Sequence, residues 1–388
     1  MIKEDTATPM LHWSESDAPC AARWRSEAGL PPPKRVVIAD DRLTADAAYR
    51  FACEGTAMLW RGDFQNARQL LLAMMRRIDR KPKKAVKPAG LPQPPVPMSM
   101  TEAFHLHRQA QSQRARKLAM LLLPLDGNYQ IPLRRAPDVR QACEEAYGGS
   151  GEASVVSLRE VLGLVGAHEW RKNGVEIPAL GARIYPHYGV FSPVRGEYID
   201  LVAQAPLPST TLAFDIGTGT GVLAAVLAMR GVAHVVATDQ DSRALACARE
   251  NIERLGLLQR IDLQRTDLFP AGRAALVVCN PPWVPARPSS PIESAIYDPE
   301  SRMLRGFLGG LAEHLEAQGE GWLILSDFAE HLGLRSRDEL LAWIEAGGLK
   351  VIGKIDTRPT HAKATVGTDL LHAARSAEVT SLWRLARR

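Results

Sequence analysis

The chain has 388 residues, of which 46% are hydrophobic and 23% are charged, so the composition predicts a globular protein with a buried core and excludes a disordered chain. Its apolar runs are short and interrupted, and the polar start Met1–Asp5 lacks the apolar region of a secretory signal, so we expect a cytoplasmic protein without a membrane span. The 5 cysteines are scattered without a C-x-x-C pair, which argues against a disulfide framework and a zinc site, and the net charge of +5 favours an acidic partner only weakly.

The N-terminal part of the chain predicts helices and a linker. The prolines of residues 1–35, and the lack of any sustained period there, predict a loosely ordered leader. Apolar residues at helical spacing then predict a helix-rich domain over residues 36–150, with Asp63 as the N-cap of one helix. A proline-rich stretch inside this domain, residues 81–98, predicts a stiff and extended linker between helical units.

The basic run beside this linker has two interpretations. Between Arg76 and Lys87 only Asp79 opposes the basic side chains, and further arginines follow in the next predicted helix. The first interpretation is a solvated face, and the second is a surface that contacts the phosphates of RNA, DNA or a ribosome. Because aromatic side chains are sparse there, the second interpretation implies contact with the phosphate backbone rather than reading of bases.

The C-terminal part predicts an α/β domain. Residues 151–185 are expected to form a connecting helix and a hairpin. Over the following domain, residues 186–388, short β-like runs alternate with helices. This pattern is typical of a mostly parallel, Rossmann-like sheet with helices on both faces.

The stretch 215–221 is the candidate binding loop of this domain. It follows the predicted strand 212–215, precedes a predicted helix and reads D-I-G-T-G-T-G. The glycines Gly217, Gly219 and Gly221 allow a tight turn and a close approach of a ligand to the backbone, and the helix N-terminus offers unpaired N–H groups. The loop therefore indicates an adenosine-containing cofactor, and by itself it does not distinguish NAD from other such cofactors.

Two further strand ends carry acidic residues. Asp239 ends the predicted strand 234–238 and lies 22 residues after Gly217, a spacing at which a carboxylate accepts hydrogen bonds from ribose hydroxyls. Asp267-Leu268-Phe269 ends the next predicted strand. We expect it to offer a carboxylate and an aromatic ring to an adenine base.

The tetrapeptide Asn280-Pro281-Pro282-Trp283 follows the fourth predicted strand and is the candidate catalytic segment. Ligands of open α/β sheets bind at the strand ends, so it is expected beside the reactive end of the cofactor. The side-chain oxygen of Asn280 and the carbonyl of Pro281 would accept both hydrogens of a planar NH2 group, which localises its lone pair for methyl transfer. The prolines lack N–H groups and fix φ, and Trp283 offers a flat stacking face. We therefore expect catalysis by orientation and fixed dipoles, with no acid-base residue required.

These segments resemble the class I S-adenosylmethionine (SAM) methyltransferases and, more narrowly, the release-factor glutamine methyltransferases of the HemK type. The resemblance covers about residues 186–385. It is carried by the glycine loop, by Ala237-Thr238-Asp239, by Asp267-Leu268-Phe269, by Val190-Phe191 with Pro193, and by the N-P-P-aromatic motif. It implies a seven-stranded sheet and SAM as the cofactor. The residues that it implies in SAM binding are Asp215, Gly217, Thr218, Gly219, Gly221, Asp239, Asp267, Leu268 and Asn280.

The chain departs from that family in three places. Trp283 stands where the family usually has Tyr, the segment 192–197 is shifted from the family's P-R-P-x-T-E, and the first 150 residues match nothing in it. These departures affect the substrate side of the site. The candidate substrate-binding residues are Tyr185, Phe191, Arg195 and Glu197.

The acceptor of the methyl group has several interpretations. We favour the side-chain amide of a glutamine in a protein substrate, of the release-factor or ribosomal-protein type, because of the HemK-like stretches. Adenine N6 in RNA or DNA is the alternative, since the same tetrapeptide type serves both acceptors and the N-terminal region is basic. A small-molecule acceptor and a non-catalytic RNA- or ribosome-binding protein that retains the fold are further alternatives.

Overall fold

The computed structural model describes residues 8–80, 98–149, 151–194, 196–288, 291–358 and 371–388. It divides into two compact units. Unit 1 comprises Met1–Met98 and Leu106–His168, and unit 2 comprises Ser99–His105 and Glu169–Arg388. Among the described residues, no helix is long and apolar enough to cross a membrane.

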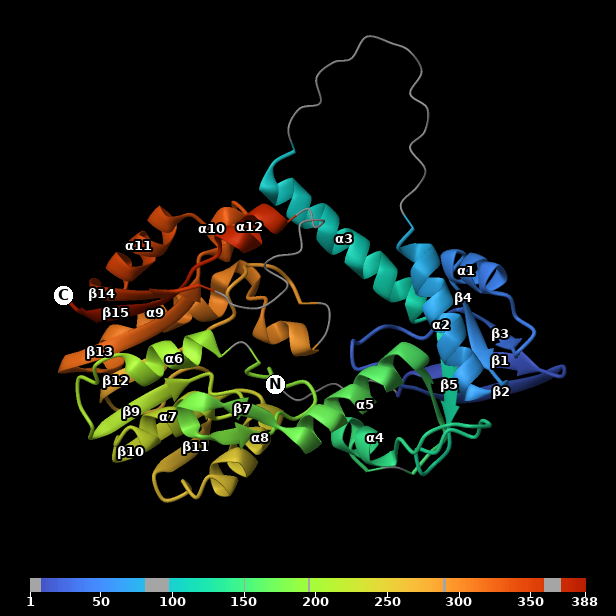
Figure 1. The fold of residues 1–388 in the computed structure, drawn as a ribbon, viewed down its shortest axis with the longest axis horizontal. Coiled ribbons are helices and arrows are strands. Elements are labelled where there is room, and N and C mark those ends of the chain that lie inside the picture. Colours follow the sequence, from blue (N-terminus) through green and yellow to red (C-terminus); the bar gives the residue numbers. More distant parts are fainter. Residues whose placement is uncertain (1–7, 81–97, 150, 195, 289–290, 359–370) are drawn as a thin grey trace, which may run out of the picture. The chain divides into compact units, whose positions relative to one another are not determined.

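Unit 1 is built on a six-stranded sheet with the strand order β1-β2-β6-β5-β4-β3 (Figure 1). The strands are β1 (Met10–Glu15), β2 (Ala18–Trp24), β3 (Arg35–Ala39), β4 (Thr56–Trp60), β5 (Leu121–Leu125) and β6 (Ser154–Ser157). Strand β4 is parallel to both of its neighbours, β3 and β5, and β6 is antiparallel to β5. The prediction of a helix-rich domain over 36–150 is therefore wrong, because its short, continuous apolar runs form buried strands.

The predicted leader is also wrong where it covers the hairpin of β1 and β2. These strands pair antiparallel from Met10 opposite Arg23 to Glu15 opposite Ala18. The two turn residues, Ser16 and Asp17, both have positive φ, at 51° and 63°. Such a turn usually contains glycine or asparagine, so this sequence gives little warning of it.

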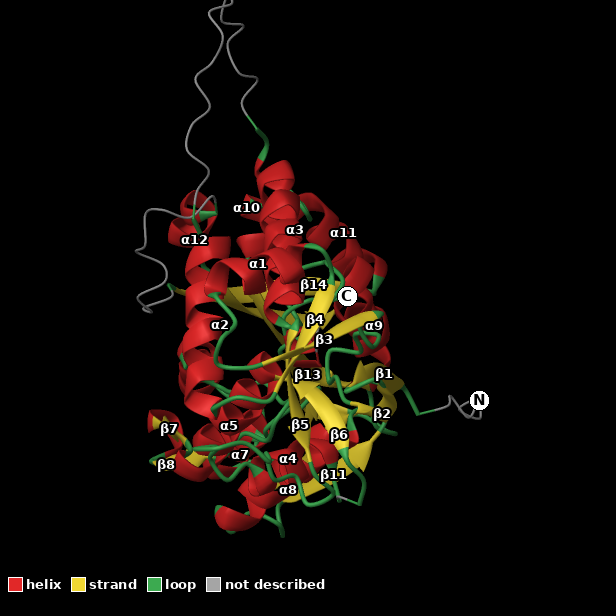
Figure 2. Cartoon of the chain, turned by 90° about the vertical axis from the view of Figure 1, so that its right-hand side faces the viewer, coloured by secondary structure: helices red, strands yellow, loops and turns green. Residues whose placement is uncertain are grey.

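Several helices lie between or after the strands of unit 1 in the sequence, and Asp63 caps one of them as expected. They are α1 (Ala45–Cys53), α2 (Phe64–Ile78), α3 (Met100–Leu118), α4 (Arg140–Tyr147) and α5 (Leu158–Asn173). Helix α1 packs on β4 and on α2 (Figure 2). The carboxylate of Asp63 accepts a hydrogen bond from the backbone N–H of Gln65 at 2.8 Å. Residues 81–97, and with them most of the predicted basic run and linker, lie outside the described residues.

Unit 2 contains the predicted α/β sheet, which has seven strands in the order β11-β10-β9-β12-β13-β15-β14 (Figure 1). The strands are β9 (Leu212–Ile216), β10 (His234–Asp239), β11 (Ile261–Arg265), β12 (Ala274–Cys279), β13 (Leu315–Ser326), β14 (Leu349–Thr357) and β15 (Thr380–Arg387). Strands β9 to β13 are parallel, while β15 is antiparallel to both of its neighbours. The predicted hairpin before this sheet is formed by β7 (Val175–Ile177) and β8 (Ala182–Ile184).

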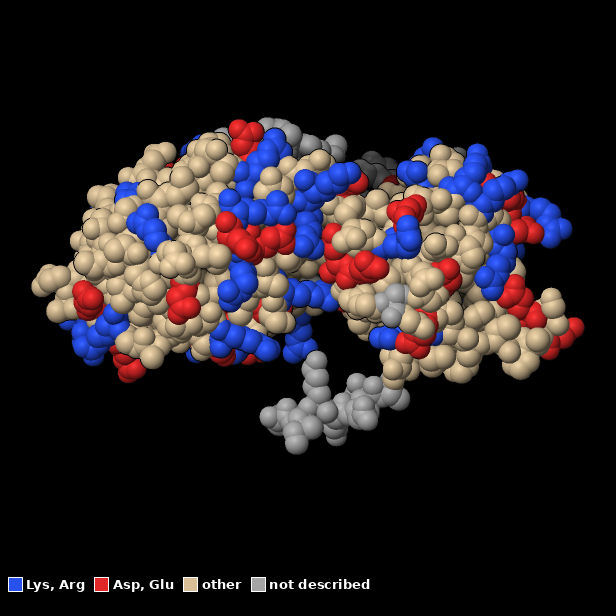
Figure 3. All heavy atoms as spheres, turned by 90° about the horizontal axis from the view of Figure 1, so that it is seen from below, with Lys and Arg blue, Asp and Glu red and all other residues tan. Residues whose placement is uncertain are grey.

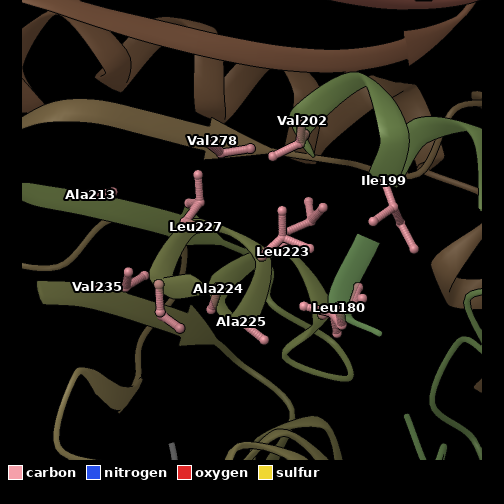
Figure 4. Packing of buried hydrophobic residues seen from close by; sticks show 14 of the residues in the cluster. Leu180, Ile199, Val202, Ala213, Leu223, Ala224, Ala225, Leu227, Val235 and Val278 are labelled. Carbon is pink, nitrogen blue, oxygen red and sulfur yellow. The ribbon is translucent and has the colours of Figure 1, made fainter. Parts of the chain in front are cut away.

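Two apolar clusters cover the two faces of this sheet. Its helices are α6 (Glu197–Gln204), α7 (Val222–Met229), α8 (Ser242–Arg254), α9 (Arg302–His314), α10 (Phe328–His331), α11 (Arg337–Ala346) and α12 (His372–Ala377). Since successive strand residues point to opposite faces, Ala213 joins the cluster with α6 and α7, and Phe214 joins the cluster with α9. Figure 4 shows the first cluster, in which Leu223 and Leu227 of α7 face Val202 of α6 and the strands.

Candidate active site at the strand ends of unit 2

Three neighbouring strands of unit 2 end side by side. Ile216, the last residue of β9, pairs with Cys279 at the end of β12 and with Thr238 near the end of β10. The residues directly after these positions are Gly217, Asp239 and Asn280. The structure therefore brings the glycine loop, the acidic strand end and the Asn-Pro-Pro-Trp segment to one edge of the sheet, where open α/β sheets bind their ligands.

The glycine loop turns with a left-handed backbone and is fixed to β10. Gly217, Gly219 and Gly221 have φ values of 73°, 57° and 81°. The backbone N–H groups of Gly217 and Thr218 both donate to the carbonyl of Thr238, at 2.9 Å and 2.8 Å. A Cβ added to Gly219 would meet no atom within 4 Å, whereas one added to Gly217 would lie 2.5 Å from Cε of Met303. The loop is therefore backed by protein at Gly217 and open to a ligand at Gly219.

Asp215 lies beneath this loop and is 1% exposed. Its Oδ2 accepts hydrogen bonds from the Thr218 hydroxyl at 2.7 Å and from the backbone N–H of Ala224, in the first turn of α7, at 3.1 Å. Because the residue before α7 is Gly221, which has no side chain to cap the helix, Asp215 takes over part of that role. Its other oxygen, Oδ1, has no hydrogen-bond partner among the described residues. Burial raises the pKa of Asp215 to about 6.

Asp239 presents a half-buried carboxylate at the end of β10. Oδ2 accepts from the backbone N–H of Gly219 at 3.0 Å, and Oδ1 accepts from the backbone N–H of Asp241 at 2.9 Å. These two bonds fix the orientation of the carboxylate. Burial raises its pKa, with the two N–H donors opposing this effect. An oriented carboxylate with remaining lone pairs is suited to accept hydrogen bonds from hydroxyl groups.

The Asp267-Leu268-Phe269 segment is tied to helix α9. Asp267 is exposed, and its Oδ2 lies 2.6 Å from Nη2 of Arg302 in an ion pair. Leu268 has a φ of 71°, and its carbonyl accepts the hydroxyl hydrogen of Thr238 at 2.6 Å. The ring of Phe269 stacks on α9 residues: its centroid lies 4.3 Å from that of His314 and 5.8 Å from that of Phe307. Its contact with an adenine base stays a prediction.

The Asn-Pro-Pro-Trp segment contains a hydrogen bond that the sequence did not reveal. The indole Nε1–H of Trp283 donates to Oδ1 of Asn280 at 2.9 Å. The indole is half-buried and packs against both clusters of the sheet and against a third cluster that includes Phe104 and Leu332. Trp283 therefore orients the side chain of Asn280, in addition to any stacking surface that it offers. The preceding Cys279 is buried, and burial raises the pKa of its thiol well above the usual value.

Sequence reasoning also missed Arg335, which is 3% exposed. Nη1 donates to the carbonyl of Trp283 at 3.4 Å, and Nη2 donates to the carbonyl of Ser326, at the end of β13, at 3.5 Å. Burial lowers the pKa of this guanidinium, and its Nε has no partner among the described residues. Arg335 thus ties the catalytic candidate segment to the next strand. It lies between α10 and α11, where no local pattern distinguishes it from an exposed arginine.

A loop after Trp283 joins the two halves of the site. The backbone N–H of Asp298 donates to the carbonyl of Val284 at 2.8 Å. The buried carboxylate of Asp298 accepts from the N–H groups of Met303 and Leu304, at 3.0 Å and 3.1 Å, and so caps α9. Met303 in turn lies against Gly217.

The segment that carries two of the candidate substrate residues, Tyr185 and Phe191, contacts helix α8. The backbone N–H of Tyr185 donates to Oδ1 of Asn251 at 2.7 Å, and the Tyr185 ring lies 4.4 Å from the guanidinium carbon of Arg254. Further along, Val190 packs on Ala244, in the first turn of α8. The segment therefore runs toward the strand ends. Phe191 is half-buried, Glu197 begins α6, and Arg195 lies outside the described residues.

No group of three His, Cys, Asp or Glu side chains that would hold a metal ion occurs in the part of the chain that the structure describes. The site thus consists of backbone N–H groups, two carboxylates, one carboxamide, proline carbonyls and an indole.

Comparison with known proteins finds similarity over the part of the chain that carries this site. The family model of the Methyltransferase small domain matches residues 182–332. The chain is 38% identical over 112 residues to a release factor glutamine methyltransferase of Cereibacter sphaeroides, covering 28% of this chain and 38% of that protein. It is 33% identical over 162 residues to the Caulobacter vibrioides protein of the same name, covering 39% and 56%. It is 41% identical over 99 residues to a tRNA1(Val) (adenine(37)-N6)-methyltransferase of Pectobacterium carotovorum, covering 24% and 40%. The chain thus spans about half or less of the length of these relatives.

Proposed function

We propose, from the methyltransferase small domain that residues 182–332 form, that this chain is a SAM-dependent N-methyltransferase acting on a planar NH2 group. The observation that carries the proposal is the meeting of the glycine loop, Asp239 and Asn280 at the ends of three adjacent strands. The first two are suited to hold a methyl donor, and the third is suited to hold an acceptor. Their separation by one strand spacing allows donor and acceptor to be oriented together.

The residues of the donor side fit SAM. The open approach at Gly219 admits a ligand against the backbone, and the start of α7 favours a negatively charged group because its N-cap has no side chain. The carboxylate of Asp239 is oriented for ribose hydroxyls. Asp215 supports the loop from below, the carbonyl of Leu268 accepts the hydroxyl hydrogen of Thr238, to which the loop is bonded, and Asp267 pairs with Arg302 at the start of α9. When bound, SAM supplies an electrophilic methyl group on a sulfonium.

On the acceptor side, Asn280 and Pro281 hold the NH2 group. Oδ1 of Asn280 receives one hydrogen bond from Trp283 and retains a second lone pair for an N–H of the substrate. The carbonyl of Pro281 accepts the other N–H, and neither Pro281 nor Pro282 offers a competing backbone donor. Both substrate hydrogens are thus engaged in fixed positions. The nitrogen lone pair is then directed at the donor, and preorganised dipoles supply the catalytic effect.

Our first candidate acceptor is a glutamine side-chain amide in a protein. Its support is the similarity to two release factor glutamine methyltransferases, one of which extends over 162 residues. The second candidate is adenine N6 in RNA. It is supported by the similarity to a tRNA adenine-N6 methyltransferase and by the exposed arginines of unit 1. Both acceptors are planar NH2 groups conjugated to a π system, so the same side chains serve either.

SAM binding tests the donor side. Calorimetry with the full chain should show binding, and Asp239→Asn should weaken it about tenfold or more, because hydrogen bonds to a charged group are worth about 1.5–3 kcal/mol. Asp241→Asn is the matched control. Asp241 caps α8 through a bond from the N–H of Arg243, a role that Asn also fills, so the control should bind SAM like the wild type. Equal affinities for all three proteins would refute the donor site.

Methyl transfer tests the reaction and the acceptor. The full chain is incubated with methyl-labelled SAM and a cell lysate, and the products are treated with RNase or with protease. Label released only by protease supports the glutamine acceptor, and label released only by RNase supports adenine. An absence of transfer by a chain that binds SAM would contradict the proposed reaction.

A further inference from the structure

We propose that the solvent face of helix α2 in unit 1 binds the phosphate backbone of RNA and thereby selects a nucleic-acid acceptor for the methyltransferase. For its second half, the acceptor, this inference rests on the proposed function with its second candidate, adenine N6 in RNA, whereas its first half, the binding surface, does not depend on that function. Its starting observation is a row of arginines whose positive charges no neighbouring carboxylate of the described residues balances.

Arg68, Arg76 and Arg80 form this row. Helix α2 has one buried face, formed by Phe64, Ala67, Leu70, Leu71 and Met74. Arg68 and Arg76 are exposed, away from that buried face, and Arg80 is exposed just beyond the helix end. Eight helical residues separate the first two, which corresponds to about 12 Å along the axis. Helix α2 itself contains no Asp or Glu.

The acids around α2 are already engaged by other arginines. Asp79, at the C-terminal end, binds Arg114 through two hydrogen bonds of 2.7 Å and 2.9 Å. Asp46, on α1, lies 2.6 Å from Nε of Arg77. Hydrogen bonding to these arginines holds the pKa of each carboxyl below its usual value. Among the described residues, no carboxylate lies within ion-pair distance of the three arginines in the row.

A second pair of arginines extends the surface at the other end of α2. The carbonyl of Arg134 accepts the N–H of Phe64 at 3.0 Å, which anchors the loop over the start of the helix. The guanidinium groups of Arg134 and Arg135 share the one carboxylate of Asp63. Nη2 of Arg134 also lies 3.9 Å from Oδ2 of Asp41, so Asp63 and Asp41 together balance these two arginines, whose side chains nevertheless remain 74% and 59% exposed.

The row is long enough for several phosphates. From Arg68 to Arg80 the chain covers roughly 18 Å at about 1.5 Å per residue. Phosphates of one strand follow one another at about 3.4 Å along a duplex axis. Guanidinium groups also match phosphate geometry because their planar fork donates two parallel hydrogen bonds.

The composition of this surface favours RNA over a protein partner. Protein interfaces have an apolar, aromatic-rich centre, whereas Leu72 is the large apolar side chain that α2 exposes, at 47%. The aromatic ring of Tyr49, on α1, is close to a positive charge, since its centroid lies 5.9 Å from Nζ of Lys117. Elsewhere, as on the face drawn in Figure 3, basic and acidic side chains are interspersed, so the net charge of +5 creates no uniform field. Binding should therefore depend on this local row and on the salt concentration.

The test uses the full chain and a fluorescein-labelled, single-stranded RNA of about 20 nucleotides, with fluorescence anisotropy measured between about 50 and 200 mM KCl. Arg68→Gln combined with Arg76→Gln should weaken binding about tenfold, and it should reduce the slope of log affinity against log salt by roughly 1.4, or about 0.7 for each lost phosphate contact. The charge-preserving pair Arg68→Lys and Arg76→Lys should retain most of the affinity.

The matched control is the pair Arg42→Gln and Arg140→Gln. Both arginines are exposed in unit 1, but each is paired with its own aspartate two positions before it, Asp40 or Asp138. This control should bind RNA like the wild type. Equal losses in both double variants, or wild-type binding that does not depend on salt, would refute the surface.

SAM calorimetry on the same proteins separates this inference from the proposed function. SAM binding without RNA binding refutes the surface and leaves the proposed function intact. RNA binding without SAM binding refutes the proposed function and leaves the surface intact. Label released from the methylated lysate by protease alone refutes the nucleic-acid acceptor.

Discussion

The two sheets of this chain differ most where their parallel strands end. In unit 1, Thr44 and Asp63 cap the helices after β3 and β4 with their own side chains. In unit 2, the helix after β9 begins at Gly221, which has no side chain, and the buried Asp215 supplies part of the cap from below. At the edge in unit 1, capping side chains accept hydrogen bonds from the first N–H groups of the helices. At the edge in unit 2, N–H groups at the helix start remain available to a ligand.

A glycine in each unit shows the same difference. A Cβ added to Gly62 of unit 1 would lie 2.5 Å from Oδ1 of Asp41, a residue that also accepts a bond from the N–H of Asp63. A Cβ added to Gly219 of unit 2 would meet nothing within 4 Å. Similar parallel strands thus produce a filled edge in one unit and an accessible edge in the other. Binding capacity depends on the loops at the strand ends and not on the sheet alone.

The largest effect is expected on kcat, when an asparagine of the unit 2 edge is replaced and compared with one of unit 1. Asn280→Ala should lower kcat for methyl transfer by about 10²–10³, the loss typical for removal of one preorganised polar group in a catalytic site. SAM affinity should be unchanged. The control is Asn128→Ala, which alters an exposed residue after β5 of unit 1 and should leave both values unchanged. Full activity of Asn280→Ala in a labelled-methyl assay would remove the catalytic role of the segment.

The two capping aspartates should respond to pH in opposite directions. The folded-state pKa of Asp215 is raised to about 6 by burial, so its carboxylate disfavours folding progressively as pH rises from about 4 to about 6. At about 1.36 kcal/mol per pH unit the loss is about 3 kcal/mol. Asp215→Asn should abolish this loss, so the variant should gain thermal stability relative to wild type between about pH 4 and pH 7.

Asp63 provides the opposite case. Its folded-state pKa is lowered, first by hydrogen bonding to Arg135, so it stabilises the fold above its unfolded pKa, and this stabilisation is lost as pH falls. Asp63→Asn should therefore lose stability relative to wild type near pH 7 and approach it in acid. Calorimetric melting temperatures over about pH 3–8 measure both trends, and parallel trends for the two variants would contradict the contrast.

A glycine pair sharpens the contrast at the binding loop. Gly219→Ala should weaken SAM binding about tenfold or more, because the methyl group occupies the space that is open to a ligand. Gly256, at the end of α8, has a φ of 69°, close to the 57° of Gly219, and likewise has nothing within 4 Å of a Cβ. Both alanines should therefore cost about 1–2 kcal/mol of stability. Calorimetry should show a loss of SAM affinity in Gly219→Ala and none in Gly256→Ala.

The smallest expected effect concerns a tryptophan in each unit. Trp283→Phe removes the N–H that holds Asn280 but keeps a ring, and at about 1 kcal/mol per hydrogen bond it should lower kcat about fivefold with little change in SAM affinity. Trp60, at the end of β4, donates its indole hydrogen to the carbonyl of Asp63 at 3.0 Å. Trp60→Phe should lower the stability of unit 1 and leave kcat unchanged. An unaltered kcat in Trp283→Phe would show that Asn280 needs no such support.

The sequence indicates the sheet of unit 2 better than that of unit 1 for a physical reason. Strands β9, β10 and β12 are apolar runs bounded by loops with glycine, aspartate or asparagine-proline, so their ends are marked. In unit 1, the runs of β3 and β4 are also apolar, but β3 directly precedes helix α1 and β4 lies between α1 and α2, so the helical periodicity around them hides them. Local patterns cannot assign such short runs, because a strand is stabilised there by partners distant in the sequence.

The candidate site shows the same limit. The glycine loop, Asp239 and Asn280 could be inferred because each comes after a strand that the sequence marks. The bond from Trp283 to Asn280 and the buried Arg335 depend on side-chain directions and on a contact 52 positions away. The stacking of Phe269 on His314 and Phe307 of α9 likewise depends on side-chain directions that no local pattern gives.

Asp298 has a consequence for the kinetics of the proposed reaction. Its backbone is bonded to Val284, directly after the acceptor segment, and its carboxylate sets the start of α9, from which Met303 lies against Gly217 of the donor loop. Donor and acceptor sides thus share one support. Loosening that support should raise KM for SAM and lower kcat together, whereas changes at Asp239 and Asn280 should separate the two constants.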